Sequence, residues 1–600
     1  MDRRRLLQAA AAAPFFIPST RGAAAAAGVP ALRPRVRPGD ADWPDPARWS
    51  ELDRAVGGRL VKVESPLIAS RSAAAASRDA LFATLRNPWL LGDSVGLTQT
   101  LAWVDAWTSQ PSAYAVAAAS AIDVAAAVDF ARRHRLRLVV KGGGHSYQGT
   151  SNAPDSLLVW TRAMNRIELH EGFVASGCAD APQPAVTVGA GAVWGPVYDA
   201  VTTRGGRYVQ GGGCLTVGVA GLVQSGGFGS FSKGHGTAAS NLLEAEVVTA
   251  DGQVRIVNRC REPELFWGLK GGGGGSLGVV TRLTLRTHPL PDGFGTVNMR
   301  IAASSDAAYR RLVGLVVAHC RDHLVDPHWG EQIIFQPGNV LSVAMLFQGI
   351  GRGEASAIWQ PFIDAVMAAP GDFRFEAAPF ILGLDARRFW DPEHWRPPGV
   401  VVRDARPGAP ASNMAWSGDV KDAGQVLNAY QSAWLPAALL REGNGTALAE
   451  ALYRASRQWG FALHLNKGLA GAPTWALDAT RDTATNPAVI DAFALMICAS
   501  NAPPAYPGVP GHEPDTAAAR SHARAVAAAM DPIRRLVPDA GAYVSESDYF
   551  QPDWARAFWG GNHPRLQAVK ARHDPDGLFF VHHGVGSERW QDNGFTPVIE

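Results

Sequence analysis

KGGGHSY, at residues 141–147, directly follows the mostly apolar run LRLVV at 136–140, and this junction decides how the chain is expected to fold. The run is typical of a β-strand, and residues 119–134 before it carry apolar side chains at helical spacing. A histidine held in a glycine turn after a strand presents its imidazole to whatever the turn wraps. The sequence therefore predicts a helix, a strand and then a turn that exposes His145.

A second turn, GGGCLTVGVAG at residues 211–221, places Cys214 in a similar glycine context. An isolated histidine in such a loop is usually just hydrogen-bonded, and an isolated cysteine is more often a small buried hydrophobe. Here two nucleophilic side chains occur in matching turns. Their joint occurrence favours one common partner over two unrelated structural roles.

Glycine clusters recur at 142–144, 211–213, 226–229 and 271–275. They interrupt strand-like runs such as 242–249, whereas flexible linkers are rich in Gly and Ser and lack Val, Ile and Phe. Glycine lets a backbone approach a partner at close range. The pattern indicates a cradle for something flat or phosphorylated.

The composition favours a large globular protein with a small-molecule partner. Of the 600 residues, 47% are hydrophobic and 18% are charged, which is enough apolar material for a substantial core. The 56 basic and 54 acidic residues leave a net charge of +2, so no nucleic-acid-binding surface is expected. After the N-terminus no apolar run reaches the roughly 18 residues of a membrane-spanning segment.

Residues 1–28 are typical of a cleaved export signal. Arg3 and Arg4 precede two leucines and an alanine-rich apolar stretch. This pattern is of the twin-arginine type, and an ordinary secretory signal is the alternative. We therefore expect an exported protein, periplasmic or extracellular. Residues 29–104 form an N-terminal extension, of which the Pro- and Arg-rich part up to residue 48 is interpreted as a tether.

Five cysteines are few for this length, and their spacing fits neither a disulfide framework nor a zinc ribbon. An odd number leaves at least one thiol unpaired. The pairing is open for four of them: Cys178, Cys260, Cys320 and Cys498. His319 and His323 lie four residues apart on a predicted helix, but the Glu of an H-E-x-x-H pattern is missing. No metal site is predicted.

Near residue 291 the glycine clusters end, and the sequence changes to alternating strand-like and helical stretches. Residues 332–335 and 340–347 flank a QPGN turn, which predicts a β-hairpin. Helical stretches are predicted near 307–318, 353–368 and 420–440. We expect a second domain over 291–535, of α+β type with an antiparallel sheet. A final segment, 536–600, is predicted to hold a strand around Tyr543 and a helix over 563–572.

With its two glycine turns the chain resembles the berberine bridge enzyme-like flavoproteins, in the superfamily of vanillyl-alcohol oxidase and p-cresol methylhydroxylase. The resemblance covers about 105–290 and 540–590. Further motifs that carry it are ELFWGLKG at 264–271, SLGVV at 276–280, YVSE at 543–546 and FWGGNHPRL at 558–566. The ending GVGSERW at 584–590 is similar to a microbial branch that includes isoamyl alcohol oxidases.

The resemblance implies an α+β fold, with a two-part FAD-binding domain of the p-cresol methylhydroxylase type and an α+β substrate domain. The FAD-binding domain is expected over 105–290 and the substrate domain over 291–535. The segment 536–600 is expected to return to the FAD-binding domain.

The resemblance also implies that FAD is bonded twice, by His145 at the flavin 8α-methyl carbon and by Cys214 at C6. Two bonds raise the reduction potential of the flavin, which eases hydride removal from a poorly activated carbon. Backbone N–H groups of the turns are expected to reach the pyrophosphate and the ring. The other expected cofactor contacts are Gly142, Gly143, Gly144, Ser146, Gly213, Thr216, Val217, Gly218, Gly221, Gly226, Gly227, Gly229, Val280 and Asn562.

Family positions locate candidates for the group that removes the hydroxyl or phenol proton of the substrate. Tyr147 matches an active-site tyrosine. Where the family commonly has Tyr-x-Asn and then Tyr, this chain has Tyr543-Val-Ser-Glu546, so Glu546 stands at a catalytic tyrosine position. A desolvated carboxylate beside a flavin is a candidate base. A solvent-facing acid at a strand end is the alternative.

LHLNK, at residues 463–467, alternates apolar and polar side chains as one face of a strand does. That face is expected either to look at the flavin or to be solvated. His464 and Lys467 are the polar residues concerned, and Lys467 joins Tyr147, Tyr543 and Glu546 as a candidate catalytic residue.

These features predict an oxidase that takes hydride from an alcohol, amine or phenolic carbon and passes electrons from FAD to O2, giving H2O2. Val217 stands where, in the family, valine permits and leucine blocks oxygen access. The alternatives are a dehydrogenase with another acceptor and a catalytically silent flavin-fold binding protein. GAGAVWG at 189–195 mimics a dinucleotide fingerprint, but RYV at 207–209 stands where its acidic residue is required.

Overall fold

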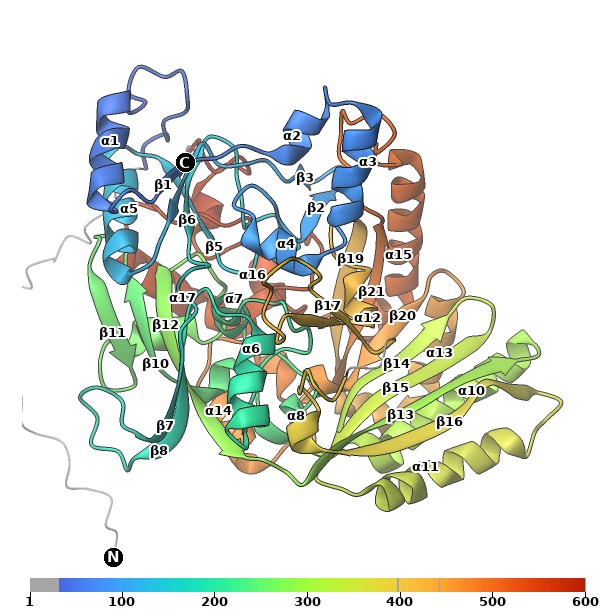
Figure 1. Cartoon of the computed structure of the whole chain (residues 1–600). Coiled ribbons are helices and arrows are strands. Elements are labelled where there is room, and N and C mark those ends of the chain that lie inside the picture. Colours follow the sequence, from blue (N-terminus) through green and yellow to red (C-terminus); the bar gives the residue numbers. More distant parts are fainter. Residues whose placement is uncertain (1–31, 396–398, 442, 599–600) are drawn as a thin grey trace, which may run out of the picture.

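Two smaller β-sheets and one large sheet, with helices packed on them, form the frame of the protein (Figure 1). The computed structural model describes residues 32–395, 399–441 and 443–598. The predicted export signal therefore lies outside the described residues. Within these ranges no helix is long and apolar enough to cross a membrane. The combination of helices with mixed and antiparallel sheets confirms the expected α+β class.

The first sheet carries the His145 turn at the end of an edge strand. Its order is β1 (Leu60–Lys62), β4 (Tyr114–Ala117), β6 (Ser156–Trp160) and β5 (Arg137–Lys141). Strands β4, β6 and β5 are parallel, and β1 is antiparallel to β4. Helix α5 (Ala121–Arg133) begins with a capping box between Ser120 and Asp123, which satisfies free N–H groups of its first turn. Helix α5 and strand β5 confirm the elements predicted before residue 141.

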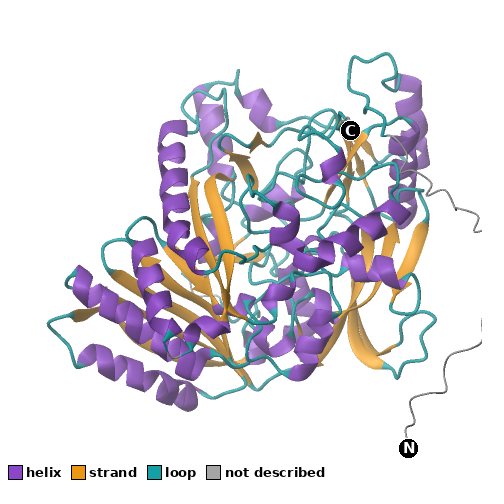
Figure 2. Cartoon of the chain, turned by 180° about the vertical axis from the view of Figure 1, so that it is seen from behind, coloured by secondary structure: helices purple, strands orange, loops and turns teal. Residues whose placement is uncertain are grey.

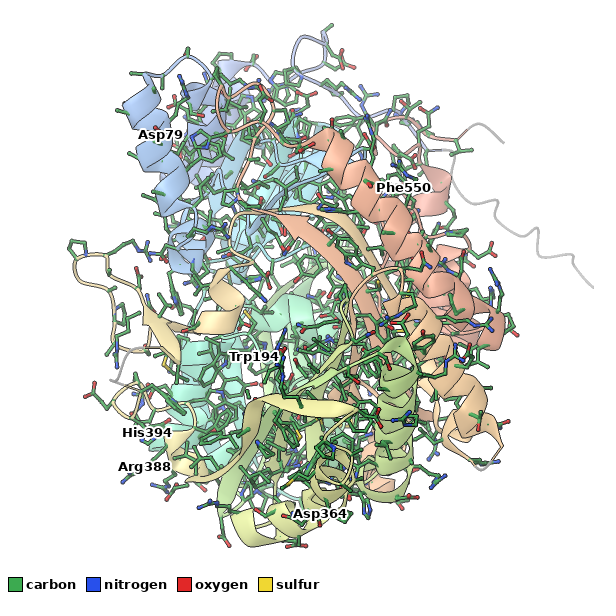
Figure 3. The ribbon with its side chains drawn as sticks, turned by 90° about the vertical axis from the view of Figure 1, so that its right-hand side faces the viewer. Asp79, Trp194, Asp364, Arg388, His394 and Phe550 are labelled. Carbon is green, nitrogen blue, oxygen red and sulfur yellow. A yellow bond between two sulfur atoms is a disulfide. The ribbon has the colours of Figure 1, made fainter. Side chains whose placement is uncertain are left out.

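The second sheet is antiparallel. Its strands are β11 (Val254–Asn258), β10 (Leu242–Val248), β12 (Val279–Pro289), β8 (Gln183–Gly189) and β7 (Ile167–Phe173), and β9 (Arg207–Val209) pairs with the far end of β12. Short helices surround it: α6 (Trp194–Tyr198), α7 (Val219–Gln224), α8 (Ser232–His235) and α9 (Pro263–Leu269). Trp194 is fully buried in the interior (Figure 3). A Cβ at Gly211 would clash with its ring at 2.3 Å, so the cysteine turn packs directly on this indole.

The third sheet is the largest, and all of its strands except β2 and β3 come from the predicted substrate domain. Its order is β16 (Phe373–Asp385), β13 (Gly293–Ala303), β15 (Val340–Gln348), β14 (Trp329–Gln336), β20 (Phe461–His464), β21 (Ala492–Ala502), β19 (Gln425–Pro436), β2 (Thr100–Trp103) and β3 (Trp107–Thr108). Neighbours are antiparallel except β2 and β19, which are parallel. The predicted antiparallel sheet and the β14–β15 hairpin are confirmed.

Long helices cover one face of the large sheet (Figure 2). They are α10 (Asp306–His319), α11 (Arg352–Met367), α13 (Asn444–Ser456) and α15 (Thr516–Leu536). On β21, Met496 and Cys498 join the core under these helices, whereas Leu495 and Ile497 join a cluster with Phe228. Because strand side chains alternate between faces, the uncovered face of the large sheet packs toward the glycine turns.

The C-terminal segment, with α16 (Trp554–Trp559) and α17 (His563–His573), packs against the first two sheets. Phe579 forms a bridge with Leu138 of β5. Lys570 Nζ donates to the carbonyl oxygens of Ser276 at 2.7 Å and Phe579 at 2.8 Å. The remaining short elements are α1 (Pro46–Ala55), α2 (Pro66–Ser70), α3 (Ala75–Thr84), α4 (Pro88–Asp93), β17 (Val401–Arg403), β18 (Met414–Trp416), α12 (Ser417–Val420) and α14 (Thr474–Arg481).

Three local predictions are wrong. The helix expected near 420–440 is strand β19, which is buried on both faces between β21 and β2 and so lacks a period of two. The strand expected around Tyr543 is a tight turn, in which Glu546 N donates to Tyr543 O at 2.9 Å. The strand containing His464 ends there, and residues 465–467 form a 3-10 turn.

Two expectations about covalent and terminal organisation also change. Cys178 and Cys260, 82 residues apart in the sequence, form a disulfide. The spacing of the cysteines does not predict this pairing. The described part of the predicted tether is docked, because Arg35 is buried and donates to the carbonyl oxygens of Gly577 at 2.6 Å and Leu578 at 3.1 Å. The N-terminal extension therefore stabilises the return of the C-terminal segment.

Candidate functional site

The two glycine turns lie against each other. A Cβ at Gly143 would stand 2.7 Å from the backbone N of Gly218, and a Cβ at Gly218 would stand 2.9 Å from the backbone N of Gly143. No side chain tolerates such contacts without movement of the backbone, so the approach requires glycine on both sides. The turns thus form one continuous wall, as expected for a shared partner.

His145 and Cys214 meet at one hydroxyl group. His145 Nε2 lies 3.0 Å from Thr216 Oγ1, and Cys214 Sγ lies 3.6 Å from the same atom. Burial lowers the pKa of His145 to about 4, so the imidazole is neutral. A neutral ring that donates from Nε2 to Thr216 keeps a lone pair on Nδ1. Burial raises the pKa of the Cys214 thiol, which is therefore protonated at neutral pH.

The histidine turn is clamped from behind by the chain that leads into β2. Lys141 Nζ donates to the carbonyl oxygens of Ser94 at 3.1 Å, Val95 at 2.6 Å and Leu97 at 3.0 Å. Burial lowers the pKa of Lys141 to about 7. Gln99 N also donates to Gly144 O at 3.0 Å. Residues 94–99 thereby fix the position from which His145 projects.

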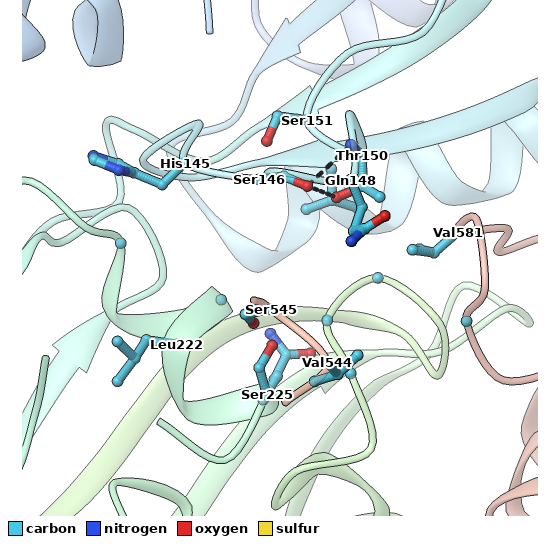
Figure 4. A pocket seen from close by; sticks show the side chains of 18 of the residues that line it. His145, Ser146, Gln148, Thr150, Ser151, Leu222, Ser225, Val544, Ser545 and Val581 are labelled. Carbon is cyan, nitrogen blue, oxygen red and sulfur yellow. Dashed lines mark hydrogen bonds between the residues drawn. The ribbon is translucent and has the colours of Figure 1, made fainter. Parts of the chain in front are cut away.

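A cavity of about 300 Å³ opens beside the two turns. In Figure 4, His145 stands at one end and Val581 of the C-terminal segment at the other, with Gln148 between them. Predicted site residues that line the cavity are Gly142, Gly143, Gly144, His145, Ser146, Tyr147, Val217, Gly218, Gly221, Val280, Lys467, Tyr543 and Glu546. The structure therefore brings together residues from five separate stretches of the chain, at 142–147, 217–221, 280, 467 and 543–546.

The other wall of the cavity is the glycine cluster 273–275, where Gly273 and Gly275 have φ of 92° and 78°. Buried polar atoms that face no partner in the described chain belong to three lining residues: Gln148 Oε1, Ser276 Oγ and His583 Nδ1. Buried polar groups are almost always hydrogen-bonded. Close backbone approach and unused donors and acceptors fit the expected FAD, whose phosphates, ribose and ring edges supply the missing partners.

Other predicted cofactor residues do not line the cavity of the described structure: Gly213, Cys214, Thr216, Gly226, Gly227, Gly229 and Asn562. Asn562 Nδ2 donates to the carbonyl oxygen of Thr485 at 2.9 Å, and Thr485 in turn touches the position of a Cβ at Gly271. Asn562 thus supports the glycine wall from outside.

Lys467 and Glu546, predicted separately, form an ion pair. Lys467 follows β20 in its 3-10 turn, and Glu546 belongs to the C-terminal turn. Their side chains are 10% and 20% exposed, so the solvated alternatives for both are wrong. Tyr543, in the same turn, packs edge-on against Phe228 at 5.0 Å between ring centroids.

Tyr147 lines this end of the cavity, and Tyr430 packs against its ring. The rings of Tyr147 and Tyr430, the latter from β19, lie 5.0 Å apart. Burial and nearby carboxylates raise the pKa of both phenols well above the usual value. Both tyrosines are therefore neutral hydrogen-bonding groups rather than bases in this state of the site.

Two partly buried acids lie near the cysteine turn rather than in the lining of the cavity. Glu331 accepts a hydrogen bond from Ser230 Oγ at 2.6 Å, and burial raises the pKa of Glu331. Burial also raises the pKa of Asp419, to about 6. In the described parts of the chain, no group of three or more His, Cys, Asp or Glu residues is arranged to hold a metal ion.

Tyr430, Glu331 and Asp419 are not marked by any sequence motif. They come from β19, β14 and α12, far from the glycine turns in sequence, and β19 itself was predicted as a helix. Gln148, in contrast, directly follows Tyr147 in the histidine turn. Its adjacency to that turn is a signal that would have found it.

Comparisons with known proteins agree with this geometry. Residues 112–258 match the model of an FAD binding domain, and residues 542–586 match the berberine and berberine-like model. The FAD-linked oxidoreductase easE of Arthroderma benhamiae is 30% identical over 485 residues, which is 80% of this chain and 89% of that protein. The chain belongs to the berberine bridge enzyme-like FAD-linked oxidoreductases. The VAO-type flavoprotein oxidase VAO615 of Thermothelomyces thermophilus is 28% identical over 93% of both chains.

Solved structures place the fold in the same family. The VAO-type flavoprotein MtVAO615 of Myceliophthora thermophila superposes with a TM-score of 0.75 at 25% identity, over 93% of this chain and 98% of that one. The glucooligosaccharide oxidase of Acremonium strictum superposes with a TM-score of 0.65 at 18% identity, over 89% and 99%. The predicted p-cresol methylhydroxylase-type fold is confirmed, and the protein is an FAD-linked oxidoreductase.

Proposed function

We propose that this berberine bridge enzyme-like protein is an oxidase whose FAD is bonded to both His145 and Cys214. The observation that carries the proposal is that one hydroxyl, Thr216 Oγ1, lies within 3.0 Å of His145 Nε2 and 3.6 Å of Cys214 Sγ. One ring system then lies within reach of both nucleophiles. In the glucooligosaccharide oxidase of A. strictum, which shares the fold, the cofactor is 6-S-cysteinyl, 8α-N1-histidyl FAD.

The residues of the cavity have distinct tasks toward this cofactor. His145 offers Nδ1 to the 8α carbon because Thr216 occupies Nε2. The glycine walls bring backbone N–H groups to the phosphates, and Gln148 and Ser276 supply unused polar atoms. When bound, FAD would supply the acceptor for the substrate's hydride and the route by which the electrons reach dioxygen.

The substrate we infer is a small molecule with an oxidisable alcohol-type carbon, or an amine or phenolic one. Glu546 holds a carboxylate in the cavity and is positioned by Lys467, so it takes the hydroxyl proton as hydride leaves. Tyr147, which lines the cavity and is neutral at physiological pH, donates a hydrogen bond that orients the substrate oxygen, and Tyr430 supports its ring. Val217 lines the cavity and leaves room for dioxygen.

We also infer export through the signal at residues 1–28. The paired Arg3 and Arg4 support the twin-arginine route, which carries proteins that have already folded around a cofactor. Substitution of both arginines by lysine is expected to hold a flavin-bearing precursor inside the cell, and unimpaired export would argue against this route.

The decisive experiment has two parts. Intact-mass measurement after acid denaturation is expected to show the polypeptide plus one FAD; an unmodified mass in a yellow preparation would refute covalent attachment. Anaerobic mixing with alcohols, sugars, phenols and amines then identifies the substrate by flavin bleaching. Glu546→Gln is expected to slow bleaching by about 10²–10⁴-fold, the usual contribution of a general base. If reduced flavin persists in air, the protein is a dehydrogenase; if no compound bleaches it, the silent binding protein is favoured.

A further inference from the structure

The bond between Cys214 and FAD, on which the following step rests, poses a chemical problem. Burial keeps this thiol protonated, and the thiolate is the nucleophilic form. The site must therefore contain a group that removes the thiol proton as the bond forms. His145 is poorly suited, since its pKa of about 4 makes it a weak base and its ring bonds the flavin in the proposed function.

The carboxyl group of Asp419 stands at the thiol. The Asp419 carboxyl group lies near enough to act on the Cys214 thiol electrostatically, and besides burial its proximity raises the pKa of that thiol. One oxygen of this carboxyl group, Asp419 Oδ2, is buried and has no hydrogen-bond partner among the described residues. An unsatisfied buried carboxylate oxygen is costly and calls for an explanation.

Helix α12, which carries Asp419, is fastened to the cysteine turn. Trp416 Nε1 donates to the carbonyl oxygen of Gly213 at 3.1 Å, and Gly213 is the residue directly before Cys214. Ser417 N donates to Val400 O at 3.0 Å, which ties the helix to the β17–β18 hairpin. These bonds hold α12 in place beside the cysteine turn.

We propose that Asp419 is the base that activates Cys214 for its attachment to flavin C6. The Sγ–H bond breaks and its proton passes to Asp419, while the sulfur electron pair forms the S–C6 bond. The hydrogen on C6 leaves as a proton. Dioxygen takes up the two electrons released and two protons to become H2O2, so one thiol, one ring C–H and one O2 give one thioether and one H2O2. The carboxyl then returns its proton to solvent.

The electrostatics of Asp419 suit this role. Burial raises its pKa to about 6, which leaves the group ionised at neutral pH yet a stronger base than an exposed aspartate. The nearby charged groups that act on Asp419 are Asp422, Glu331 and Lys421. Once the thioether forms, the thiol proton is gone and Asp419 has no further task in turnover.

The test isolates the cysteine bond by removing the histidine bond. In His145→Ala, any FAD that survives denaturation is held by Cys214 alone. The double variant, which carries both His145→Ala and Asp419→Asn, is expected to form the cysteine–flavin adduct about 10²–10⁴-fold more slowly than His145→Ala alone. Intact mass of full-length protein harvested at successive times follows this rate. Incubating the double variant in air at rising pH should restore the adduct about tenfold per pH unit, because hydroxide replaces the missing base; a merely structural defect would not respond in this way.

The matched control is Asp422→Asn in the same background. Asp422 lies three residues on and accepts a hydrogen bond from Asn501 Nδ2 at 3.0 Å, with burial raising its pKa as well. Because the charge of Asp422 acts on the pKa of Asp419 while the proposed base itself stays in place, this variant is expected to change the rate of adduct formation far less than Asp419→Asn does. Asp419→Asn with His145 intact should stay yellow after denaturation, which shows that the fold and the histidine bond survive.

Each outcome decides the matter. Equal adduct rates with and without Asp419, or equal slowing by the Asp422 control, would overturn the role of Asp419 while leaving the double attachment intact. Absence of any adduct in His145→Ala, together with no flavin on the Cys214 peptide of the wild type, would overturn both the double attachment and the base.

Discussion

Replacing Gly143 with alanine is expected to separate the two glycine turns. The new Cβ would stand 2.7 Å from Gly218 N and 3.2 Å from Thr216 O, and both neighbours are backbone atoms that cannot rotate away. Relief of such a clash needs a shift of several tenths of an ångström between the walls. Overpacking of this kind typically costs about 1–3 kcal/mol of stability.

The same shift changes the covalent chemistry, because Gly143 precedes His145 while Thr216 follows Cys214. Misplacement of reacting atoms by about 1 Å costs on the order of 100-fold in rate. A shift of part of that size should slow formation of the second flavin bond by about tenfold. Peptide mapping of protein harvested at successive times measures the fraction of chains carrying both bonds, and chemical denaturation measures the stability.

Gly314→Ala is the matched control. Gly314 lies within α10 and no atom stands within 4 Å of its added Cβ, so the same substitution should stabilise the protein by about 0.5–1 kcal/mol. The idea that the turns are held in contact would be refuted by two results together. The free energy of unfolding of Gly143→Ala would lie within about 0.5 kcal/mol of the wild-type value, and both flavin bonds would form as in the wild type.

Three further outcomes are expected. Val217→Leu should slow reoxidation of reduced flavin by dioxygen while leaving its reduction by substrate nearly unchanged; equal reoxidation rates in stopped-flow would contradict the oxygen-access role of Val217. Cys178→Ser removes the disulfide that spans 82 residues and should cost about 2–5 kcal/mol in denaturation, with dithiothreitol reproducing the loss in the wild type. Burial lowers the pKa of His288 to about 3 from 6.5, so the unfolded chain takes up the proton first and stability should fall as the pH drops from 6.5 toward 3. His288→Gln keeps a donor for Asn241 Oδ1, which His288 Nε2 contacts at 2.8 Å, and should remove up to about 1.4 kcal/mol of that loss per pH unit; identical acid profiles would count against a neutral His288.

The features predicted well from sequence are those set by local chemistry. The His145 turn follows a strand because residues 136–140 are apolar except for Arg137 and glycines then follow, which no distant contact needs to enforce. The hairpin of β14 and β15 is likewise decided by the QPGN turn between two alternating runs. Both elements carry their own signal.

The features that could not be predicted depend on distant partners. Residues 425–436 become a strand because β21 and β2 supply hydrogen bonds on both edges, and burial of both faces erases the period of two. Glu546 and Lys467 were each named from sequence, but their ion pair depends on a turn replacing the expected strand at Tyr543. Asp419 meets Cys214 only because α12 folds back onto the cysteine turn.

The parallel pairing of β2 with β19 bears on how a substrate reaches its reaction partner. The short stretch that adds β2 and β3 to the large sheet continues directly into β4 of the first sheet, and residues 94–99 just before it clamp the His145 turn. If the two halves moved apart about a hinge, either the pairing of β2 with β19 or the short connection from β3 to β4 would have to break or stretch. We therefore expect a substrate to reach the cavity without the two halves moving apart.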